Sequence, residues 1–181
     1  MKNVILIHSY NGDTLESFAP SIEKYCEQNK INYFAPKFPI RKEAYYDKWE
    51  AILNQYNINK DTIIIAHSLG TQFTLKYLAL HNLEINTYIS VAGFVDYEGR
   101  KDLEEILDRF RPSDNDFEKC KLLIKNRYSI YSDNDELNEI SKLEKYADKL
   151  NAKKILLKGK GHFNPKSEVK EIIEINEIIG K

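Results

Sequence analysis

Residues 62–71 constrain the fold more than any other part of the chain. They read TIIIAHSLGT, a run of β-branched residues followed by small-x-Ser-x-Gly and then by the pattern of an amphipathic helix. This order predicts a buried strand, a sharp turn and a helix, which together hold a serine hydroxyl exposed at the end of a parallel strand. The crowded turn needs small residues two positions before and after Ser68, and Ala66 and Gly70 satisfy this. The alternative is that Ser68 only caps the helix.

Short apolar runs and helical periods alternate along the rest of the chain. We expect strands at residues 4–7, 32–35, 62–66, 87–91, 128–131 and 153–157. We expect helices from Asp13 or Thr14, as N-cap, through Leu15 to Tyr25, and then at residues 44–56, 69–80, 103–110, 117–125, 139–150 and 168–179. Alternation of this kind predicts an α/β fold with about six mostly parallel strands and helices on both faces of the sheet.

Length and composition narrow the class of protein. A chain of 181 residues is long enough for one domain, expected to span 1–181, with a substantial core. A net charge of −1 gives no electrostatic reason to bind nucleic acid or an anionic membrane. Two cysteines, Cys26 and Cys120, suggest no disulfide framework, and no apolar run approaches the roughly 20 residues of a membrane span. We expect a cytoplasmic protein of undetermined oligomeric state.

A serine nucleophile needs a neighbouring base, and the chain offers four histidines. His162 lies in the glycine-rich loop KGKGHF between the last strand and the last helix, where flanking glycines would let an imidazole reach over the sheet edge. His8 ends the first strand. His67 should diverge from its neighbour at the sharp turn, and His81 ends a helix. Elimination and position therefore predict His162 as the base, with an ordinary surface histidine as the alternative.

The loop after the fifth predicted strand reads SDNDE and supplies two candidate acids, Asp133 and Asp135. Both lie between Ser68 and His162, in the chain order that α/β-hydrolases use. We favour Asp135, because an Asx turn just after the strand could occupy the carboxylate of Asp133. Asp135 lies deeper in the loop, ahead of a helix that we expect Asn138 to cap. The residues alone leave both aspartates open.

Acyl transfer also requires hydrogen-bond donors for the developing oxyanion. We expect the backbone N–H of Leu69 to be one and that of Tyr10, in the turn after the first strand, to be the other. A plain strand-to-helix turn is the alternative at Tyr10. No metal-ligand spacing, dinucleotide fingerprint or Walker motif is present, so no cofactor or metal is expected. Six aromatic residues could line a pocket or belong to the core: Tyr45, Tyr46, Trp49, Phe94, Tyr97 and Phe110.

With these motifs in view, the chain resembles the small serine-hydrolase family of the α/β-hydrolase superfamily, which includes YdeN-like bacterial proteins and the retinoblastoma-binding serine hydrolase. The resemblance rests on four segments: VILIH at 4–8, IIIAHSLG at 63–70, YSDND at 131–135 and GHF at 161–163. It implies a minimal hydrolase fold with little or no cap, and Ser68, His162 and Asp135 as nucleophile, base and acid. The chain departs from the family pattern at Ser9, where glycine is usual, and at residues 136–138, which lack a common proline.

The sequence therefore predicts a serine hydrolase that cleaves a small carboxylic ester, or an amide or thioester, through an acyl-enzyme. Ser68 would attack, His162 would transfer the proton, and Asp135 would orient the imidazole. The alternative is a non-catalytic binding or scaffold protein built on a hydrolase fold. The expected partner is a small-molecule ester or amide, whose identity the sequence does not indicate.

Overall fold

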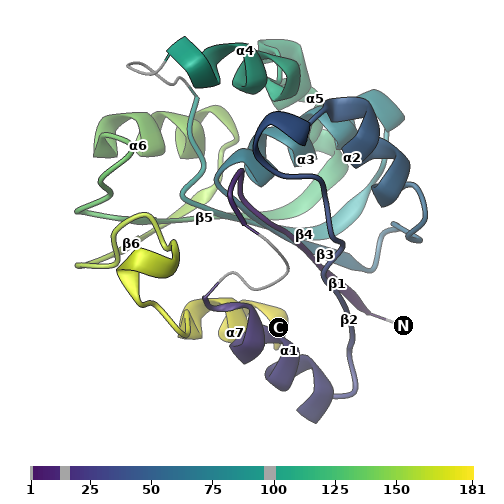
Figure 1. Ribbon diagram of the computed structural model, residues 1–181. Coiled ribbons are helices and arrows are strands. Elements are labelled where there is room, and N and C mark those ends of the chain that lie inside the picture. Colours follow the sequence, from purple (N-terminus) through teal and green to yellow (C-terminus); the bar gives the residue numbers. More distant parts are fainter. Residues whose placement is uncertain (1, 13–16, 96–100) are drawn as a thin grey trace.

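A parallel β-sheet forms the centre of the computed structural model, which describes residues 2–12, 17–95 and 101–181 and, at 101 and 102, the backbone only. In this part of the chain the sheet has six strands in the order β2-β1-β3-β4-β5-β6 (Figure 1). The strands are β1 (Asn3–Ile7), β2 (Asn32–Phe34), β3 (Thr62–His67), β4 (Ile85–Val91), β5 (Ile124–Ser132) and β6 (Lys153–Leu157). The predicted α/β fold is confirmed.

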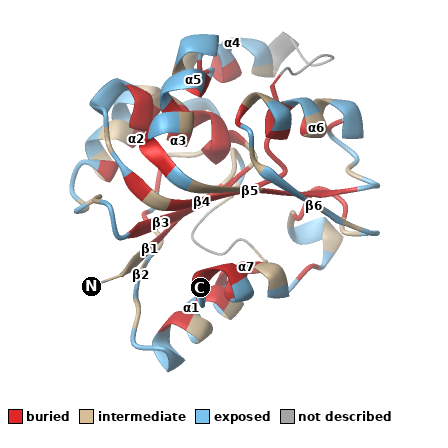
Figure 2. Ribbon diagram, turned by 180° about the vertical axis from the view of Figure 1, so that it is seen from behind, coloured by how far each residue is buried: buried red, intermediate tan, exposed pale blue. Residues whose placement is uncertain are grey.

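Helices cover both faces of the sheet. The described α-helices are α1 (Ala19–Gln28), α2 (Tyr46–Leu53), α3 (Leu69–His81), α4 (Lys101–Phe110), α5 (Asp114–Leu123), α6 (Ile140–Lys149) and α7 (Ile173–Ile179). The short 3₁₀ helices are η1 (Arg41–Glu43) and η2 (Pro165–Ser167). Helices α1 and α7 lie on one face and the others on the opposite face, with their buried residues turned toward the sheet (Figures 1 and 2). None of the described helices has the length and apolar character needed to cross a membrane.

Strand β3 shows why a central strand carries consecutive apolar residues, here Ile63 to Ala66. Ile63 and Ile65 pack in the core beneath α1 and α7, whereas Ile64 and Ala66 pack in the core on the opposite face. Successive side chains of a strand point to opposite faces, so a strand covered on both sides needs an unbroken apolar run. All six residues of β3 are buried, which anchors the turn that follows it.

Helices α1 and α7 begin later than the sequence predicts, and α2 (Tyr46–Leu53) is shorter at both ends than the predicted 44–56. Helix α1 begins at Ala19, with Pro20 in its first turn, and Phe18 occupies the N-cap position. The expected cap residues Asp13 and Thr14, with Leu15, lie outside the described residues. Helix α7 begins at Ile173 and not at Glu168, because Glu168 adopts a left-handed conformation with φ of 53°.

Helix α5 starts earlier than residue 117 and ends before residue 125. Ser113 and Asp116 form a reciprocal capping box, a signal that the apolar periodicity did not reveal. Ile124, expected in this helix, is instead the first residue of β5 and is hydrogen-bonded in register with Ile85. The strand therefore begins four residues before the predicted boundary at Tyr128.

Helix α3, which follows the serine, is buried on nearly all sides and is not amphipathic. Its residues from Leu69 to Leu75 are all buried, and only Leu80 and His81 are exposed. The helix contacts α4 and α5 on its outer side as well as the sheet, so its polar residues are covered too. This burial makes α3 a rigid support for the residues at its N-terminus.

Candidate active site

Ser68 lies in a strained turn between β3 and α3. Its backbone has φ of 51° and ψ of −118°, a conformation rarely adopted by residues other than glycine. The N–H of Ser68 donates to the carbonyl of Val91 at the end of β4 (3.0 Å), and its own carbonyl accepts from the N–H of Thr71 (2.9 Å). Ser68 occupies the N-cap position of α3, but its side chain makes no capping hydrogen bond. The alternative that Ser68 serves only as a helix cap is therefore wrong.

Gly70 allows α3 to pack directly on the end of β1. A Cβ atom at this position would lie 2.7 Å from the carbonyl oxygens of both Ile7 and His8. Carbon atoms do not approach backbone oxygens this closely, so a side chain here would push the helix away from the strand. The expected requirement for a small residue two positions after Ser68 has this specific cause.

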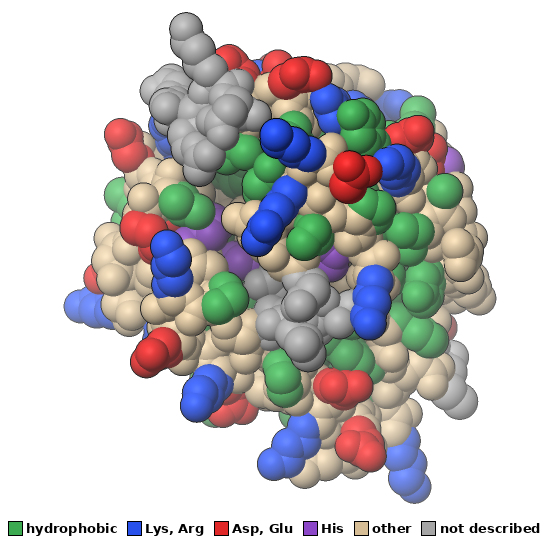
Figure 3. All heavy atoms as spheres, in the orientation of Figure 1, with side chains coloured by type: hydrophobic (Ala, Val, Ile, Leu, Met, Phe, Trp, Pro, Cys, Tyr) green, Lys and Arg blue, Asp and Glu red, His purple; other side chains and the backbone are tan. Residues whose placement is uncertain are grey.

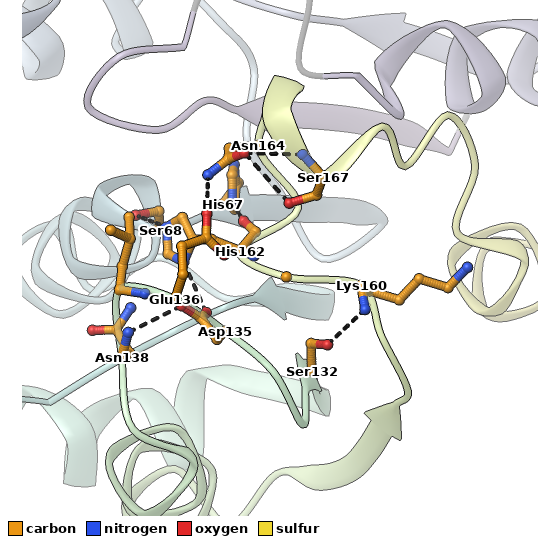
Figure 4. A network of polar contacts seen from close by, with 12 residues as sticks. His67, Ser68, Ser132, Asp135, Glu136, Asn138, Lys160, His162, Asn164 and Ser167 are labelled. Atoms are coloured by element: carbon orange, nitrogen blue, oxygen red, sulfur yellow. Dashed lines mark hydrogen bonds and ion pairs between the residues drawn. The ribbon is translucent and has the colours of Figure 1, made fainter.

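Ser68, His162 and Asp135 form a continuous chain of hydrogen bonds (Figure 4). The Oγ of Ser68 lies 2.9 Å from Nε2 of His162, and Nδ1 of the same ring lies 2.8 Å from Oδ2 of Asp135. The three residues come from the loops after β3, β6 and β5. The side chains of His162 and Asp135 are only 4% and 1% exposed, so water hardly competes for the bond between them.

The surroundings of Asp135 keep its carboxylate ionised. Burial by itself would raise the pKa of this carboxyl. Two effects outweigh burial. His162 hydrogen-bonds and attracts the carboxylate, and Oδ1 accepts from the N–H groups of Leu137 (2.8 Å) and Asn138 (3.0 Å). The pKa of Asp135 therefore lies below its usual value. An ionised acceptor at this point holds the proton of His162 on Nδ1 and leaves Nε2 free to face Ser68.

The two aspartates of this loop have different partners, and the expected reason for choosing between them is wrong. Asp133 makes no Asx turn; its Oδ1 accepts from the distant N–H of Gly159 (2.8 Å). The bonds to N–H groups two and three residues ahead belong to Asp135. Asn138 does not cap α6 either, because Glu139 occupies the N-cap position and makes no side-chain capping bond.

Among the described residues, His162 is the histidine that reaches Ser68. His67 is fully buried, and its Nε2 donates to the carbonyl of His162 (2.8 Å). His8 is buried as well: its Nδ1 donates to the carbonyl of Ser9 (2.7 Å), and its Nε2 accepts from the N–H of Phe38 (3.1 Å). His81 is exposed beside Glu50. Sequence reasoning missed the support that His67 provides for the backbone of His162.

A cleft of about 510 Å³ opens at Ser68 and His162. In the space-filling view, histidine is visible in a hollow between Lys or Arg side chains (Figure 3). The apolar lining of the cleft includes Phe94, Leu103 and Leu107. Of the other aromatic candidates, Trp49 and Phe110 are core residues, Tyr46 packs against this core, Tyr45 is 39% exposed, and Tyr97 lies outside the described residues.

Leu69 and Tyr10, the predicted oxyanion donors, also line this cleft. Leu69 is the first residue of α3, so its N–H has no intrahelical acceptor. Tyr10 lies in a turn closed by a hydrogen bond from the N–H of Gly12 to the carbonyl of Ser9 (3.2 Å). Within the described part of the chain, the N–H of Tyr10 has no acceptor, whereas its carbonyl accepts from the N–H of Arg41 (3.1 Å). Donation by Tyr10 stays a prediction.

The parallel sheet, the strained serine turn and the histidine after the last strand together define an α/β-hydrolase fold. The model of the serine hydrolase family matches residues 5–180, and the chain belongs to this family. The putative hydrolase YdeN of Bacillus subtilis strain 168 is 25% identical over 168 residues, which cover 90% of this chain and 86% of YdeN.

Solved structures agree with this fold. The crystal structure of the B. subtilis ydeN gene product has a TM-score of 0.89 at 22% identity and covers 99% of this chain and 97% of its own. Est1E from Butyrivibrio proteoclasticus, solved with ferulic acid bound, has a TM-score of 0.68 at 13% identity, covering 99% of this chain and 86% of its own. At these identities the likeness establishes the fold and leaves the substrate open.

Proposed function

We propose that this protein cleaves small carboxylic esters through an acyl-enzyme, with Ser68 as nucleophile, His162 as general base and Asp135 as the orienting acid. The observation that carries the proposal is the unbroken hydrogen-bond chain from Asp135 through His162 to the Ser68 hydroxyl, which ends at the cleft. Membership of the serine hydrolase family supports it. A small amide or thioester is a second substrate class for the same chemistry.

The geometry allows a complete reaction cycle. Ser68 Oγ attacks the ester carbonyl carbon while its proton passes to His162 Nε2. The tetrahedral intermediate collapses, and the alcohol leaves with the proton returned by His162. Water then attacks the acyl-enzyme by the same route, which releases the carboxylic acid and restores the serine hydroxyl. Asp135 stays ionised throughout and stabilises the imidazolium that forms twice in each cycle.

The negative charge that develops on the carbonyl oxygen needs donors on the far side of the scissile group. We assign this role to the backbone N–H of Leu69 and to that of Tyr10. The apolar wall formed by Phe94, Leu103 and Leu107 would take a hydrocarbon acyl or alcohol portion. No cofactor takes part in any of these steps.

Labelling with a serine-reactive fluorophosphonate tests the proposal. The probe should modify Ser68 in the wild-type protein, and peptide mass mapping should locate the adduct there. Ser68→Ala should abolish labelling and lower hydrolysis of p-nitrophenyl acetate and butyrate by about 10⁴- to 10⁶-fold. Ser9→Ala is the matched control, because Ser9 lines the same cleft. An adduct on Ser9 or Ser132 would contradict the assignment, and a folded wild-type protein without labelling or turnover would favour the binding-protein alternative.

A further inference from the structure

The loop that carries His162 is held in place by the loop that carries Asp135. Four consecutive backbone N–H groups of residues 159–162 donate to four side chains of residues 132–136. The pairs are Gly159 with Asp133 Oδ1 (2.8 Å), Lys160 with Ser132 Oγ (2.8 Å), Gly161 with Asn134 Oδ1 (2.8 Å) and His162 with Glu136 Oε2 (2.9 Å). We call these four side chains the loop clamp. The remaining residue of the segment, Asp135, bonds the imidazole itself.

Glu136 is the member of the loop clamp that acts at the histidine. Its Oε2 accepts from the backbone N–H of His162, and its Oε1 accepts from the side-chain Nδ2 of Asn164 (2.7 Å). Asn164 Oδ1 in turn accepts from the N–H groups of Lys166 and Ser167 in η2 (2.9 and 3.2 Å). One carboxylate thereby ties the acid loop to both the base and the turn that follows it (Figure 4).

Gly161 shows that the fit between Glu136 and the base loop is close. Its φ is +53°, in the left-handed region, and a Cβ atom would lie 2.5 Å from Ser167 Oγ and 3.1 Å from Glu136 Oε2. At Gly159, two residues earlier, the same construction meets nothing within 4 Å. The absence of a side chain at Gly161 therefore leaves room for both Ser167 and the carboxylate of Glu136 beside the backbone.

The imidazole of His162 has to stay in line with a hydroxyl that belongs to a separate, rigid element. Asp135 restrains the ring and His67 restrains the carbonyl of His162, but neither restrains its N–H. We propose that Glu136 is a positioning residue, whose carboxylate fixes the backbone of His162 so that Nε2 faces Ser68 Oγ. This inference rests on the proposed function, and it adds a fourth side chain to the machinery.

Three variants separate positioning from general support of the fold. Glu136→Ala removes both acceptors. Glu136→Gln keeps one carbonyl oxygen and replaces the other acceptor by a donor, so it can satisfy only one of the two N–H groups. Asp133→Ala is the matched control. It removes the same kind of bond from the same loop, but the N–H that loses its acceptor is that of Gly159, three residues upstream of His162.

Ester hydrolysis and fluorophosphonate labelling should respond in a graded way. We expect Glu136→Ala to lower kcat and the labelling rate by about 10- to 100-fold, because a small displacement of a catalytic group costs about this much. KM should stay within about threefold. In kcat, Glu136→Gln should fall between Glu136→Ala and wild type. Asp133→Ala should lower kcat clearly less than Glu136→Ala does, because Asp133 bonds the loop at Gly159 and not at His162. A wild-type kcat in Glu136→Ala, or an equal loss in Asp133→Ala, would overturn the proposal.

The imidazole itself gives a readout that does not depend on turnover. In nitrogen-edited NMR spectra, the His162 Nδ1 proton bonded to Asp135 should be resolved in wild type and Asp133→Ala, and broadened by exchange in both Glu136 variants. An unchanged signal in the Glu136 variants would reject the positioning role. A wild-type protein with this signal but no labelling or hydrolysis would show instead that the proposed function has failed. Glu136→Gln keeps the test decisive if Glu136→Ala does not fold.

Discussion

The proposed nucleophile and the proposed base of this site are held in opposite ways. Ser68 is fixed by backbone hydrogen bonds and close packing. Its N–H donates to the end of β4, its carbonyl accepts from Thr71, and Gly70 allows α3 to pack against β1. The loop of His162 is held by polar side chains, each 26 to 28 residues earlier in the chain than the N–H group that it accepts from. The first arrangement depends on shape and local backbone geometry. The second depends on a set of specific acceptors, so we expect the two regions to respond to different substitutions.

The largest expected effect separates the two aspartates of the acid loop. Asp135→Asn should lower kcat by about 10⁴-fold, because the amide no longer favours the required imidazole tautomer or stabilises its positive charge. Asp133→Asn keeps an oxygen that can accept from Gly159, and it should change kcat less than about threefold. Steady-state kinetics with p-nitrophenyl butyrate on both folded proteins decides this. The reverse ranking would assign the acid to Asp133.

A methyl group added at Gly70 tests whether the serine turn is held by packing. Gly70→Ala would place Cβ 2.7 Å from two backbone oxygens, which cannot rotate away as a side chain can. We expect a loss of about 1 to 3 kcal/mol in the free energy of unfolding, from forced displacement of α3, together with a fall in the fluorophosphonate labelling rate. Urea unfolding measures the first quantity. Wild-type stability and labelling would show that packing at this position does not hold the turn.

The two glycines of the base loop test the other region. Both glycines have positive φ, a conformation that strains an alanine. Gly159→Ala and Gly161→Ala should therefore each lower the free energy of unfolding by roughly 1 to 2 kcal/mol. Only at Gly161 would the added Cβ also lie too close to the side chains of Ser167 and Glu136. We therefore expect both variants to be less stable in urea unfolding, but only Gly161→Ala to lose most of its kcat. Equal kcat values would argue that the loop tolerates displacement of the Glu136 carboxylate.

The smallest expected effect is on stability in acid. The pKa of Asp135 is lower in the folded protein than the value of about 3.9 expected for the unfolded chain. The ionised carboxylate therefore makes its full contribution to the free energy of unfolding at pH values above about 3.9. The contribution is lost as the pH falls through the folded pKa. Between pH 5 and 3, the free energy of unfolding should therefore fall more steeply in wild type than in Asp135→Asn. Parallel pH profiles would show that this carboxylate is not preferentially ionised in the folded state.

The contrast between the two regions explains which predictions from the sequence were confirmed. The strand, turn and helix around Ser68 are encoded within ten consecutive residues, so apolar runs and small residues predicted them. Helix ends were less predictable where polar signals decided them, as at the Ser113 capping box. For the proposed acid, the sequence led to Asp135 with a wrong argument about turns. It also gave Asn138 the N-cap position of α6, which Glu139 occupies.

The amino-acid sequence by itself determined the α/β alternation, the buried central strands and the serine turn, because each depends on residues close together in the chain. It also indicated which loops meet, since parallel strands bring their carboxyl ends to one edge of the sheet. Only the tertiary structure decided what the meeting loops do there. The bonds from Glu136 to His162 and from His67 to its carbonyl join residues 26 and 95 positions apart. Such bonds require donor–acceptor distances set to within a fraction of an ångström and nearly linear geometry. The chain reaches this geometry only once the sheet has assembled.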